Sequence, residues 1–309
     1  MPGMSTRPVR LIALMNQKGG VGKTTTTVNL AAAFARAGRR TLVVDLDPQA
    51  HASLHLGVDS ATLERSVYDL LLDPSLDAGG IIRRATENLD VLPSTTDLAA
   101  AEIDLAAEPD RLKRLEAIFA ALGDRYDHIL IDCPPSLGLL TLNGLAAARE
   151  VIIPMQAHFL ALQGVGKLME TVRLASRSFN PRLRVLGVVL CMHDPTSTHA
   201  REVVADLEGF FEAGRDQDTP WRYARVLRPP VRRNIKLAEC PSFGQTIFDY
   251  APDAPGAQDY AAIAEGLTRE WDALVAKLAS AASPAPTHAQ VSTPGRQAPV
   301  ASPGAEASA

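Results

Sequence analysis

One ten-residue segment constrains the fold of this chain more than any other. Residues 16–25 read NQKGGVGKTT, follow a short apolar run and precede a pattern of helical period. Glycines in such a loop let backbone N–H groups converge on phosphate oxygens, and the helix N-terminus adds a favourable dipole. The segment therefore predicts a strand, a phosphate-binding loop and a helix in direct succession.

Two side chains of this loop would carry its chemistry. Lys23 is placed to reach the β- and γ-phosphates of a nucleotide, and the hydroxyl of Thr24 is placed to ligate Mg²⁺. The usual pattern has glycine six residues before that lysine, but this chain has Gln17 there and a second lysine, Lys18, beside it. A glycine-rich turn with an incidental lysine is the alternative interpretation, so the loop needs support from elsewhere in the sequence.

Acidic residues at two later strand ends supply that support. Asp45 and Asp47 lie in the segment VVDLDPQ (43–49), and Asp132 lies in ILIDCPP (129–135). In an open parallel sheet, ligands bind outside the carboxyl ends of the strands. Carboxylates there hold Mg²⁺, usually through water, or orient an attacking water molecule. We expect these three carboxylates to converge on the phosphate loop.

The order of elements predicts the fold class. Short apolar runs alternate with amphipathic segments from residue 7 to residue 278, which indicates an α/β fold with a doubly wound, mostly parallel sheet flanked by helices. Strands are expected at 10–15, 41–45, 89–92, 128–132, 150–154 and 185–190, with a weaker one at 223–227. Helices are expected at 24–37, 107–122, 139–147, 163–178, 198–212 and 257–279.

Composition limits the class of protein. The 309 residues are 46% hydrophobic, which is enough for a sizeable core, and no apolar stretch approaches the ~20 residues of a membrane span. The three cysteines stand far apart without a CxxC pair, and residues 1–9 lack a signal-peptide core. These features favour a reducing cytoplasm over a secreted, disulfide-linked or zinc-binding protein.

The loop KGGVGKTT (18–25), the segment DLDPQ (45–49) and the segment DCPP (132–135) resemble the ParA family of partitioning ATPases. That family belongs to the deviant-Walker group of P-loop NTPases, which includes MinD. The segment NIKLAECPS (234–242) is similar to the RNVRLSEAPS stretch of ParA proteins and narrows the resemblance towards them. The likeness covers about residues 9–274.

The resemblance implies a domain organisation. We expect an N-terminal extension over 1–8 and a ParA-like ATPase domain over 9–279. The remaining residues, 280–309, are rich in Ala, Ser and Pro and poor in apolar branched side chains. Such a composition cannot offset the entropy of ordering, so we expect a disordered tail.

The resemblance also implies roles for individual residues. Lys18 corresponds to the signature lysine that crosses a nucleotide-sandwiched dimer to the partner's phosphates. Asp47 would activate or position the hydrolytic water, while Thr24, Asp45 and Asp132 would support Mg²⁺. The adenine would lie near residues 229–234. The implied ATP contacts are Lys18, Gly19, Gly20, Val21, Gly22, Lys23, Thr24, Thr25, Pro229 and Asn234.

A basic strip at residues 222–236, RYARVLRPPVRRNIK, qualifies the overall charge. The whole chain carries a formal −4, but this strip carries +6 without an acid, which leaves −10 on the remainder. Arginine and lysine contact DNA phosphates non-specifically, and the resemblance implies such binding by an ATP-bound dimer. The candidate DNA contacts are Arg201, Arg225, Arg228, Arg232, Arg233 and Lys236.

Two departures from related sequences leave the DNA contacts open. Residues 195–198 read PTST where relatives often carry arginines, and Lys236 replaces an arginine of the RNVRLSEAPS pattern. A solvated surface loop is the alternative interpretation of the strip, and some of its arginines could serve the nucleotide instead.

Taken together, the motifs predict an ATP-hydrolysing switch that is cytoplasmic and nucleoid-associated and works with a ParB-like partner. Its cargo could be a chromosome, a plasmid or a protein assembly. A MinD-like membrane switch is one alternative, but helix 257–279 carries acids that suit anionic lipid poorly. An amido-ligase or a nitrogenase iron-protein relative is another; the redox version would need cluster-ligating cysteines, and Cys133 and Cys191 show no such pattern.

Overall fold

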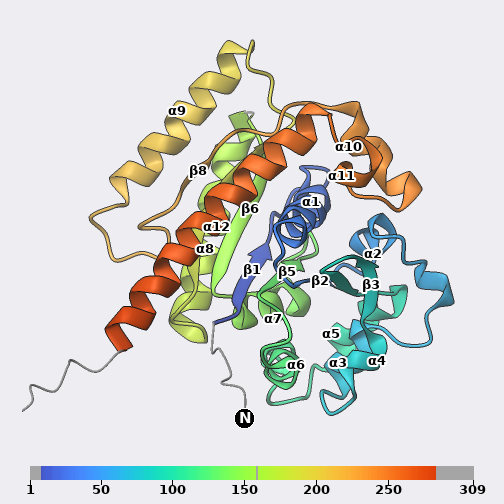
Figure 1. Cartoon of the computed structure of the whole chain (residues 1–309). Helices are drawn as coiled ribbons and strands as arrows, with labels where there is room; N and C mark the ends of the chain where they lie inside the picture. The colour runs from blue at the N-terminus through green and yellow to red at the C-terminus, as the bar shows by residue number, and fades with distance from the viewer. Residues whose placement is uncertain (1–7, 158, 283–309) are drawn as a thin grey trace, which may run out of the picture.

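The described part of the chain forms an α/β domain around one sheet of eight strands (Figure 1). The computed structural model describes residues 8–157 and 159–282. The strand order is β3-β4-β2-β5-β1-β6-β7-β8, and only β3 runs antiparallel to its neighbour. The strands are β1 (Arg10–Leu14), β2 (Thr41–Asp45), β3 (Arg83–Thr86), β4 (Leu89–Leu92), β5 (His128–Asp132), β6 (Glu150–Gln156), β7 (Arg184–Cys191) and β8 (Arg225–Leu227).

Helices cover both faces of this sheet, so successive side chains of a central strand enter two different cores. In β1, Ile12 and Leu14 belong to the core that contains residues of α1, α2, α11 and α12, whereas Ala13 belongs to the core that contains residues of α3, α6, α7, α8 and α9. This explains why the strands read as continuous apolar runs. The helices are α1 (Lys23–Arg36), α2 (His51–His55), α3 (Val67–Leu72), α4 (Ala78–Ile81), α5 (Ala101–Asp104), α6 (Arg114–Leu122), α7 (Leu139–Ala147), α8 (Phe159–Ser178), α9 (Thr198–Ala213), α10 (Ile235–Glu239), α11 (Ile247–Tyr250) and α12 (Pro255–Ala282).

The predicted fold class is confirmed, with differences at the edges. The expected helix 107–122 begins only at Arg114, because residues 107–113 form turns that include Pro109. Strand β3 was not predicted, since its half-exposed pattern lacks an apolar run. Helix α12 continues to Ala282, so residues 280–282 of the predicted tail are helical. Residues 283–309 of that tail, and 1–7 of the predicted extension, lie outside the described residues.

The sheet brings the phosphate loop and the two acidic motifs together at the carboxyl ends of its central strands. Strand β5 lies between β1 and β2, with Asp132 in register with Leu14 on one side and Asp45 on the other. The connection from β1 leads to β2 on one side of it, whereas the connection from β5 passes β1 and leads to β6 on the other side. Open α/β sheets bind ligands where the strand order reverses direction in this way.

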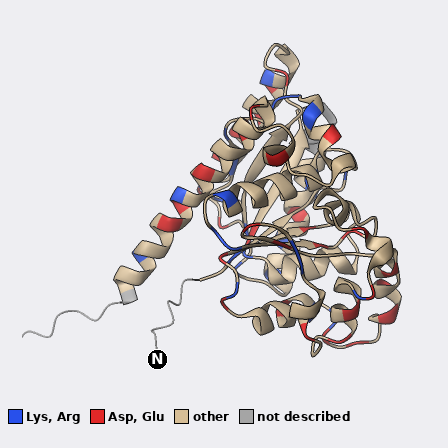
Figure 2. Cartoon of the chain, turned by 45° about the vertical axis from the view of Figure 1, so that its right-hand side comes forward, with Lys and Arg blue, Asp and Glu red and all other residues tan. Residues whose placement is uncertain are grey.

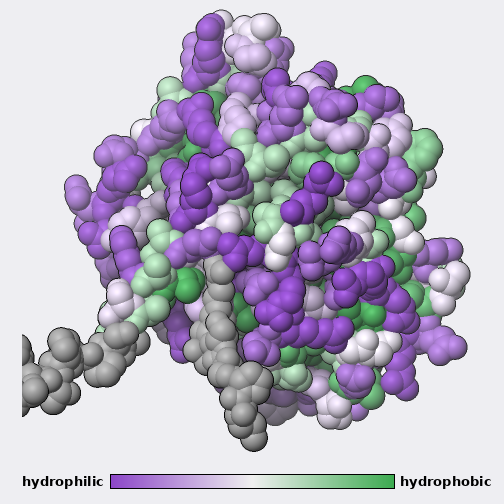
Figure 3. Space-filling view, in the orientation of Figure 1, coloured by the Kyte–Doolittle hydropathy of each residue, from purple (hydrophilic) through white to green (hydrophobic). Residues whose placement is uncertain are grey.

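The surface is mixed in character. Figure 3 shows hydrophobic residues interspersed with hydrophilic ones on the visible face. Within residues 8–157 and 159–282, no helix combines the length and apolar composition that crossing a membrane requires.

Candidate functional site

The phosphate loop connects β1 to α1 in a conformation that requires glycine. Gly20 and Gly22 have φ values of 71° and 93°, in the left-handed region that side chains with a Cβ rarely adopt. Asn16 fixes the start of the loop: its Oδ1 accepts from the Lys18 N–H at 3.0 Å, and its Nδ2 donates to the Pro154 carbonyl at 2.8 Å. The loop is therefore tied to β6 as well as to its own strand.

Asp132 lies beneath the loop and organises the first turn of α1. Its Oδ2 accepts from the Thr24 hydroxyl at 2.7 Å, and its Oδ1 accepts from the Thr27 hydroxyl at 2.8 Å. The side chain is 1% exposed. Burial raises the pKa of Asp132 to about 6, against the lowering effect of both threonines and of Lys23. A buried carboxylate of this kind gains from a nearby cation, which fits a magnesium site at Thr24.

Asp45 faces inward from the end of β2. Its Oδ2 accepts from the backbone N–H and hydroxyl of Ser53 at 2.8 and 2.7 Å, and its Oδ1 accepts from the Asp47 N–H at 3.1 Å. Burial, and then the charge of Asp132, raise the pKa of Asp45 to about 7. These bonds hold the start of α2 and the turn at Asp47, so a metal-binding role for Asp45 stays a prediction.

A cavity of about 480 Å³ opens above the loop and gathers most of the predicted residues. Lys23, 8% exposed, and the partly buried Asp47 both line it, and the Oδ1 of Asp47 accepts from the Gln49 N–H at 3.0 Å. Of the remaining predicted loop residues, Gly19, Gly20, Gly22, Thr24 and Thr25 also line it. The other two loop residues do not line the cavity: the side chain of Val21 is buried, and Lys18 is exposed.

Sequence reasoning missed half of this cavity's wall. The additional lining residues are Gln49, His51, Leu54, His55, Pro135, Met192 and Pro241. Gln49 and Pro135 belong to the two acidic motifs and could have been included on that ground. The others come from α2 and from distant loops, whose approach no local pattern in the sequence indicates.

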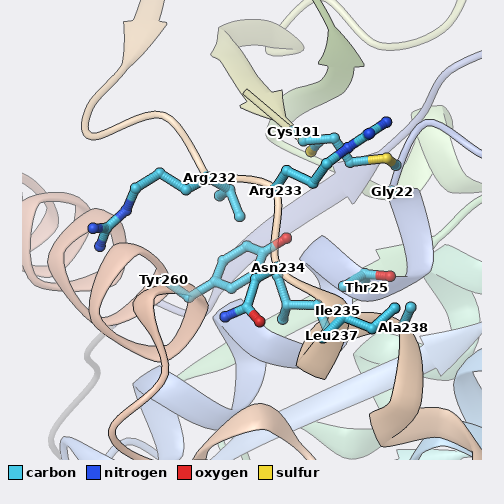
Figure 4. A pocket seen from close by; sticks show the side chains of 12 residues that line it. Gly22, Thr25, Cys191, Arg232, Arg233, Asn234, Ile235, Leu237, Ala238 and Tyr260 are labelled. Carbon is cyan, nitrogen blue, oxygen red and sulfur yellow. The ribbon is translucent and has the colours of Figure 1, made fainter. Parts of the chain in front are cut away.

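A second, more apolar cavity of about 370 Å³ adjoins the loop at Gly22 and Thr25 (Figure 4). Asn234, which was predicted to contact ATP, lines it; its Oδ1 accepts from the Lys236 N–H, while its Nδ2 is buried without a hydrogen-bond partner among the described residues. Such an orphaned donor suits an acceptor on a planar base. Pro229, also predicted, is not among the lining residues. Tyr260, Cys191 and Ile235 line the cavity and were missed.

Four of the six cations of the basic strip form ion pairs, three of them with acids from other helices. Arg228 pairs with Glu208 of α9 at 2.6 Å, and Arg232 pairs with Asp259 of α12 at 2.7 Å. Figure 2 shows acidic and basic residues side by side along the long helix α12. The other pairs are Arg225 with Glu270 and Lys236 with Glu239.

Two predicted DNA contacts stand outside these pairs. Arg233 makes no hydrogen bond or ion pair through its side chain within the part of the chain that the structure describes, and it extends towards Cys191 and Gly22 in Figure 4. Arg201 of α9 donates a hydrogen bond to the Thr198 hydroxyl at 3.0 Å. The structure therefore separates the six candidates into four paired cations, Arg201 and Arg233.

The three cysteines are reduced and buried. Cys133 lies in the turn after β5 and packs against Gly144 of α7. A Cβ atom at position 144 would lie only 2.9 Å from the Cys133 sulfur, so the two residues are in close contact. In residues 8–157 and 159–282, no group of three His, Cys, Asp or Glu side chains is placed to hold a metal ion.

His55 gives the cavity wall a pH-dependent stability. Its side chain is 1% exposed, and burial lowers its pKa from 6.5 to about 4, although a backbone hydrogen bond with Gln245 opposes this. Between pH 6.5 and pH 4, His55 is protonated in the unfolded chain but not in the folded chain. The free energy of unfolding therefore falls as the pH decreases towards 4. By linkage the total loss is roughly 3 kcal/mol.

We expect His55→Gln to remove this loss. Urea unfolding at pH 7 and pH 5, without nucleotide or metal, should show a stability change that differs between wild type and variant by about 2 kcal/mol. Asp45 and Asp132, whose raised pKa values act in the opposite direction, are common to both chains. His51→Gln, an exposed neighbour on α2, is the matched control. Identical pH dependence in all three chains would contradict the assignment.

Comparison with known proteins identifies the family. The model of a family described as an AAA domain matches residues 9–185. Sporulation initiation inhibitor protein Soj of Bacillus subtilis is 44% identical over 257 residues, which cover 83% of this chain and 97% of Soj. The chain belongs to the ParA/Soj family of partitioning ATPases. Chromosome partitioning protein ParA of Myxococcus xanthus is 41% identical over 260 residues, 84% of this chain and 88% of that protein.

Solved structures agree with this membership. Cobyrinic acid a,c-diamide synthase of Mycobacterium smegmatis, with bound ADP and magnesium, has a TM-score of 0.72 at 36% identity and covers 86% of this chain and 96% of its own. The septum site-determining protein MinD of Pyrococcus horikoshii, complexed with Mg-ADP, has a TM-score of 0.63 at 26% identity and covers 84% and 96%. Both confirm the predicted fold of the ParA/MinD P-loop NTPases.

Proposed function

We propose that this ParA/Soj-family chain binds ATP with Mg²⁺, forms a nucleotide-sandwiched homodimer and, in that state, binds DNA non-specifically to segregate or position it. The observation that carries the proposal is the arrangement at the carboxyl edge of the sheet. Lys23, Thr24 and Asp47 line one cavity, Asp132 holds Thr24, and an apolar cavity with an orphaned donor on Asn234 lies next to it.

The residues divide the chemistry among themselves. Lys23 and the N–H groups of the loop bind the phosphates, and the glycine conformations aim those groups at one point. The Thr24 hydroxyl, with Asp132 behind it, would hold Mg²⁺, which when bound neutralises charge on the phosphate oxygens. Asp47 lines the same cavity and would orient the attacking water.

Lys18 couples this site to a second subunit. It is exposed and directly precedes Gly19, which lines the cavity. A lysine there can reach a partner's phosphates and stabilise charge that develops during phosphoryl transfer. Hydrolysis would then depend on dimerisation, and a ParB-like protein would stimulate it in a cytoplasmic, nucleoid-associated cycle.

The membrane alternative has less support from the structure. Of the apolar stripe on α12, Ile263, Leu267 and Trp271 are buried against the domain, and only Leu274 and Leu278 are exposed. Two acids of α12, Asp259 and Glu270, pair with arginines of the basic strip. An amide-forming enzyme has one observation in its favour, the 36% identity to cobyrinic acid a,c-diamide synthase, but Soj and ParA are more similar in sequence.

Nucleotide-dependent DNA binding tests the proposal. We expect fluorescence anisotropy to show binding of a random-sequence duplex with ATP and Mg²⁺, little binding with ADP, and no uptake by anionic liposomes in parallel. Arg233→Gln should lower the DNA affinity several-fold and reduce the salt slope by about one unit. Arg232→Gln should have a smaller effect, because Asp259 already neutralises that guanidinium.

Arg233 lines the apolar cavity, so ATP affinity is measured in the same variants. Unchanged ATP affinity with weakened DNA binding supports a direct contact. DNA binding that is equal with and without nucleotide would contradict the switch, and recruitment to liposomes would favour the MinD-like alternative.

A further inference from the structure

A cavity of about 340 Å³ lies at the edge of the sheet opposite the phosphate loop. Arg149, which directly precedes β6, and Arg182, two residues before the start of β7, line it at the amino ends of these strands, whereas the phosphate loop follows the carboxyl end of β1. Residues 109–113, which precede helix α6 at the lower end of the domain in Figure 1, and Glu116 of α6 also line the cavity. The cavity is therefore separate from the nucleotide site.

Arg149 is a partly buried cation that forms no ion pair with any described residue. Its backbone is fixed by hydrogen bonds to Leu11 and Arg184. Within residues 8–157 and 159–282, its guanidinium makes no hydrogen bond and no ion pair. Desolvating a charge without pairing it is costly, so a partly desolvated guanidinium without an ion pair would gain from an anion bound in the cavity.

Other buried arginines of this domain are paired. Arg10 donates to Glu150 at 2.6 Å and to the Leu267 carbonyl at 2.7 Å. Arg114 forms ion pairs with Glu108 at 2.8 Å and with Asp110 at 2.9 Å. Arg149 is partly buried and, in contrast to these two arginines, has no such partner among the described residues.

The residues around Arg149 give the cavity an excess of positive charge. The cavity is lined by four cations, Arg111, Lys113, Arg149 and Arg182, and by two acids, Asp110 and Glu116. Asp110 is already paired with Arg114. In agreement, the pKa of Arg149 is lowered, first by burial and then by the positive charge of Arg182, with Glu116 opposing.

The walls that carry these cations are fixed in place. Asn180 donates to the carbonyls of Leu145, Ala146 and Ala148 at 2.7, 3.0 and 2.7 Å, which joins the α8–β7 connection to the end of α7. Arg184 donates to the carbonyls of Pro181 and Leu183, on either side of Arg182. Arg182 is thus presented by an anchored loop.

We propose that this cavity binds a small, multiply charged phosphate anion or phosphate ester through Arg149 and Arg182, with Arg111 and Lys113 at its rim. Guanidinium groups match phosphate oxygens in pairs, and several cations suit a ligand with more than one negative charge. The concave shape favours a compact ligand over a DNA duplex, whose phosphates lie on a convex surface.

Inorganic pyrophosphate is the probe, titrated calorimetrically at constant ionic strength into the full chain. Arg149→Gln and Arg182→Gln should each weaken a binding event by at least 10-fold. Arg177→Gln, an exposed arginine of α8 that does not line the cavity, should stay within 2-fold of wild type. The phosphate loop is common to all four chains, so differences among them report on this cavity alone.

Two further readouts keep the proposal falsifiable. Without pyrophosphate, the thermal midpoint of Arg149→Gln should equal or exceed that of wild type, because an unpaired cation contributes no stabilising pair. A lower midpoint with unchanged pyrophosphate affinity would assign Arg149 a purely structural role and overturn the proposal. Equal losses in Arg177→Gln, or losses of duplex DNA affinity without any of pyrophosphate affinity, would overturn it as well.

Discussion

Replacing Lys23 with alanine is expected to lower the affinity for ATP by at least about 100-fold, which corresponds to about 2.8 kcal/mol. The ammonium group of Lys23 is almost fully buried and lines the cavity together with the glycines of the loop. A charge-assisted bond to phosphate in such a desolvated place is stronger than one at the surface. Titration of a fluorescent ATP analogue at protein concentrations below those of dimer formation would measure the loss.

Lys18→Ala is the matched control, because both lysines belong to the same loop. Lys18 is exposed, so its loss should leave ATP binding to the single subunit within a few-fold of wild type. The same change should abolish ATP-dependent dimerisation, as followed by light scattering. Retention of nucleotide affinity in Lys23→Ala would contradict the phosphate-loop interpretation, and equal effects of the two changes would remove the distinction between their roles.

The phosphate site was predictable because its parts are local in sequence. The loop, the helix that follows it and the aspartates at strand ends each occupy one short segment, and a parallel sheet brings such segments to one edge. Even so, the sequence could not show that Asp45 turns inward to Ser53 while Asp47 lines the cavity. The alternation of side-chain direction along a strand does not determine which of two nearby carboxylates accepts hydrogen bonds from a buried donor such as Ser53.

The second cavity and the charge distribution depend on contacts between distant segments. Tyr260 of α12 and Cys191 of β7 meet at Gly22, and no periodic pattern connects those three positions. The +6 strip looked like a free basic surface because its counter-charges, Glu208, Asp259 and Glu270, lie elsewhere in the sequence. The net charge of a segment depends only on its own residues. The electrostatic potential at its surface also depends on the acids that the fold places next to it.

Replacing Asp47 with alanine is expected to reduce ATP turnover by at least about 100-fold, within the range by which a positioned general base accelerates a reaction. Asp47 lines the cavity beside Lys23 and Thr24, and its Oδ1 accepts from the Gln49 N–H. Its Oδ2 makes no hydrogen bond within the described ranges and is the atom that would receive the water. Phosphate release under saturating ATP, together with light scattering of the ATP-bound dimer, would show a dimer that assembles and fails to separate.

Asp47→Asn separates chemistry from structure. The asparagine oxygen can still accept from Gln49, so the turn before α2 should be preserved, but the amide cannot act as a base. We expect turnover to fall as far in Asp47→Asn as in Asp47→Ala, with ATP affinity and thermal midpoint close to wild type. If Asp47→Asn hydrolysed ATP at the wild-type rate, the acidic function of Asp47 would be discarded and its role would reduce to holding the turn that Asp45 also supports.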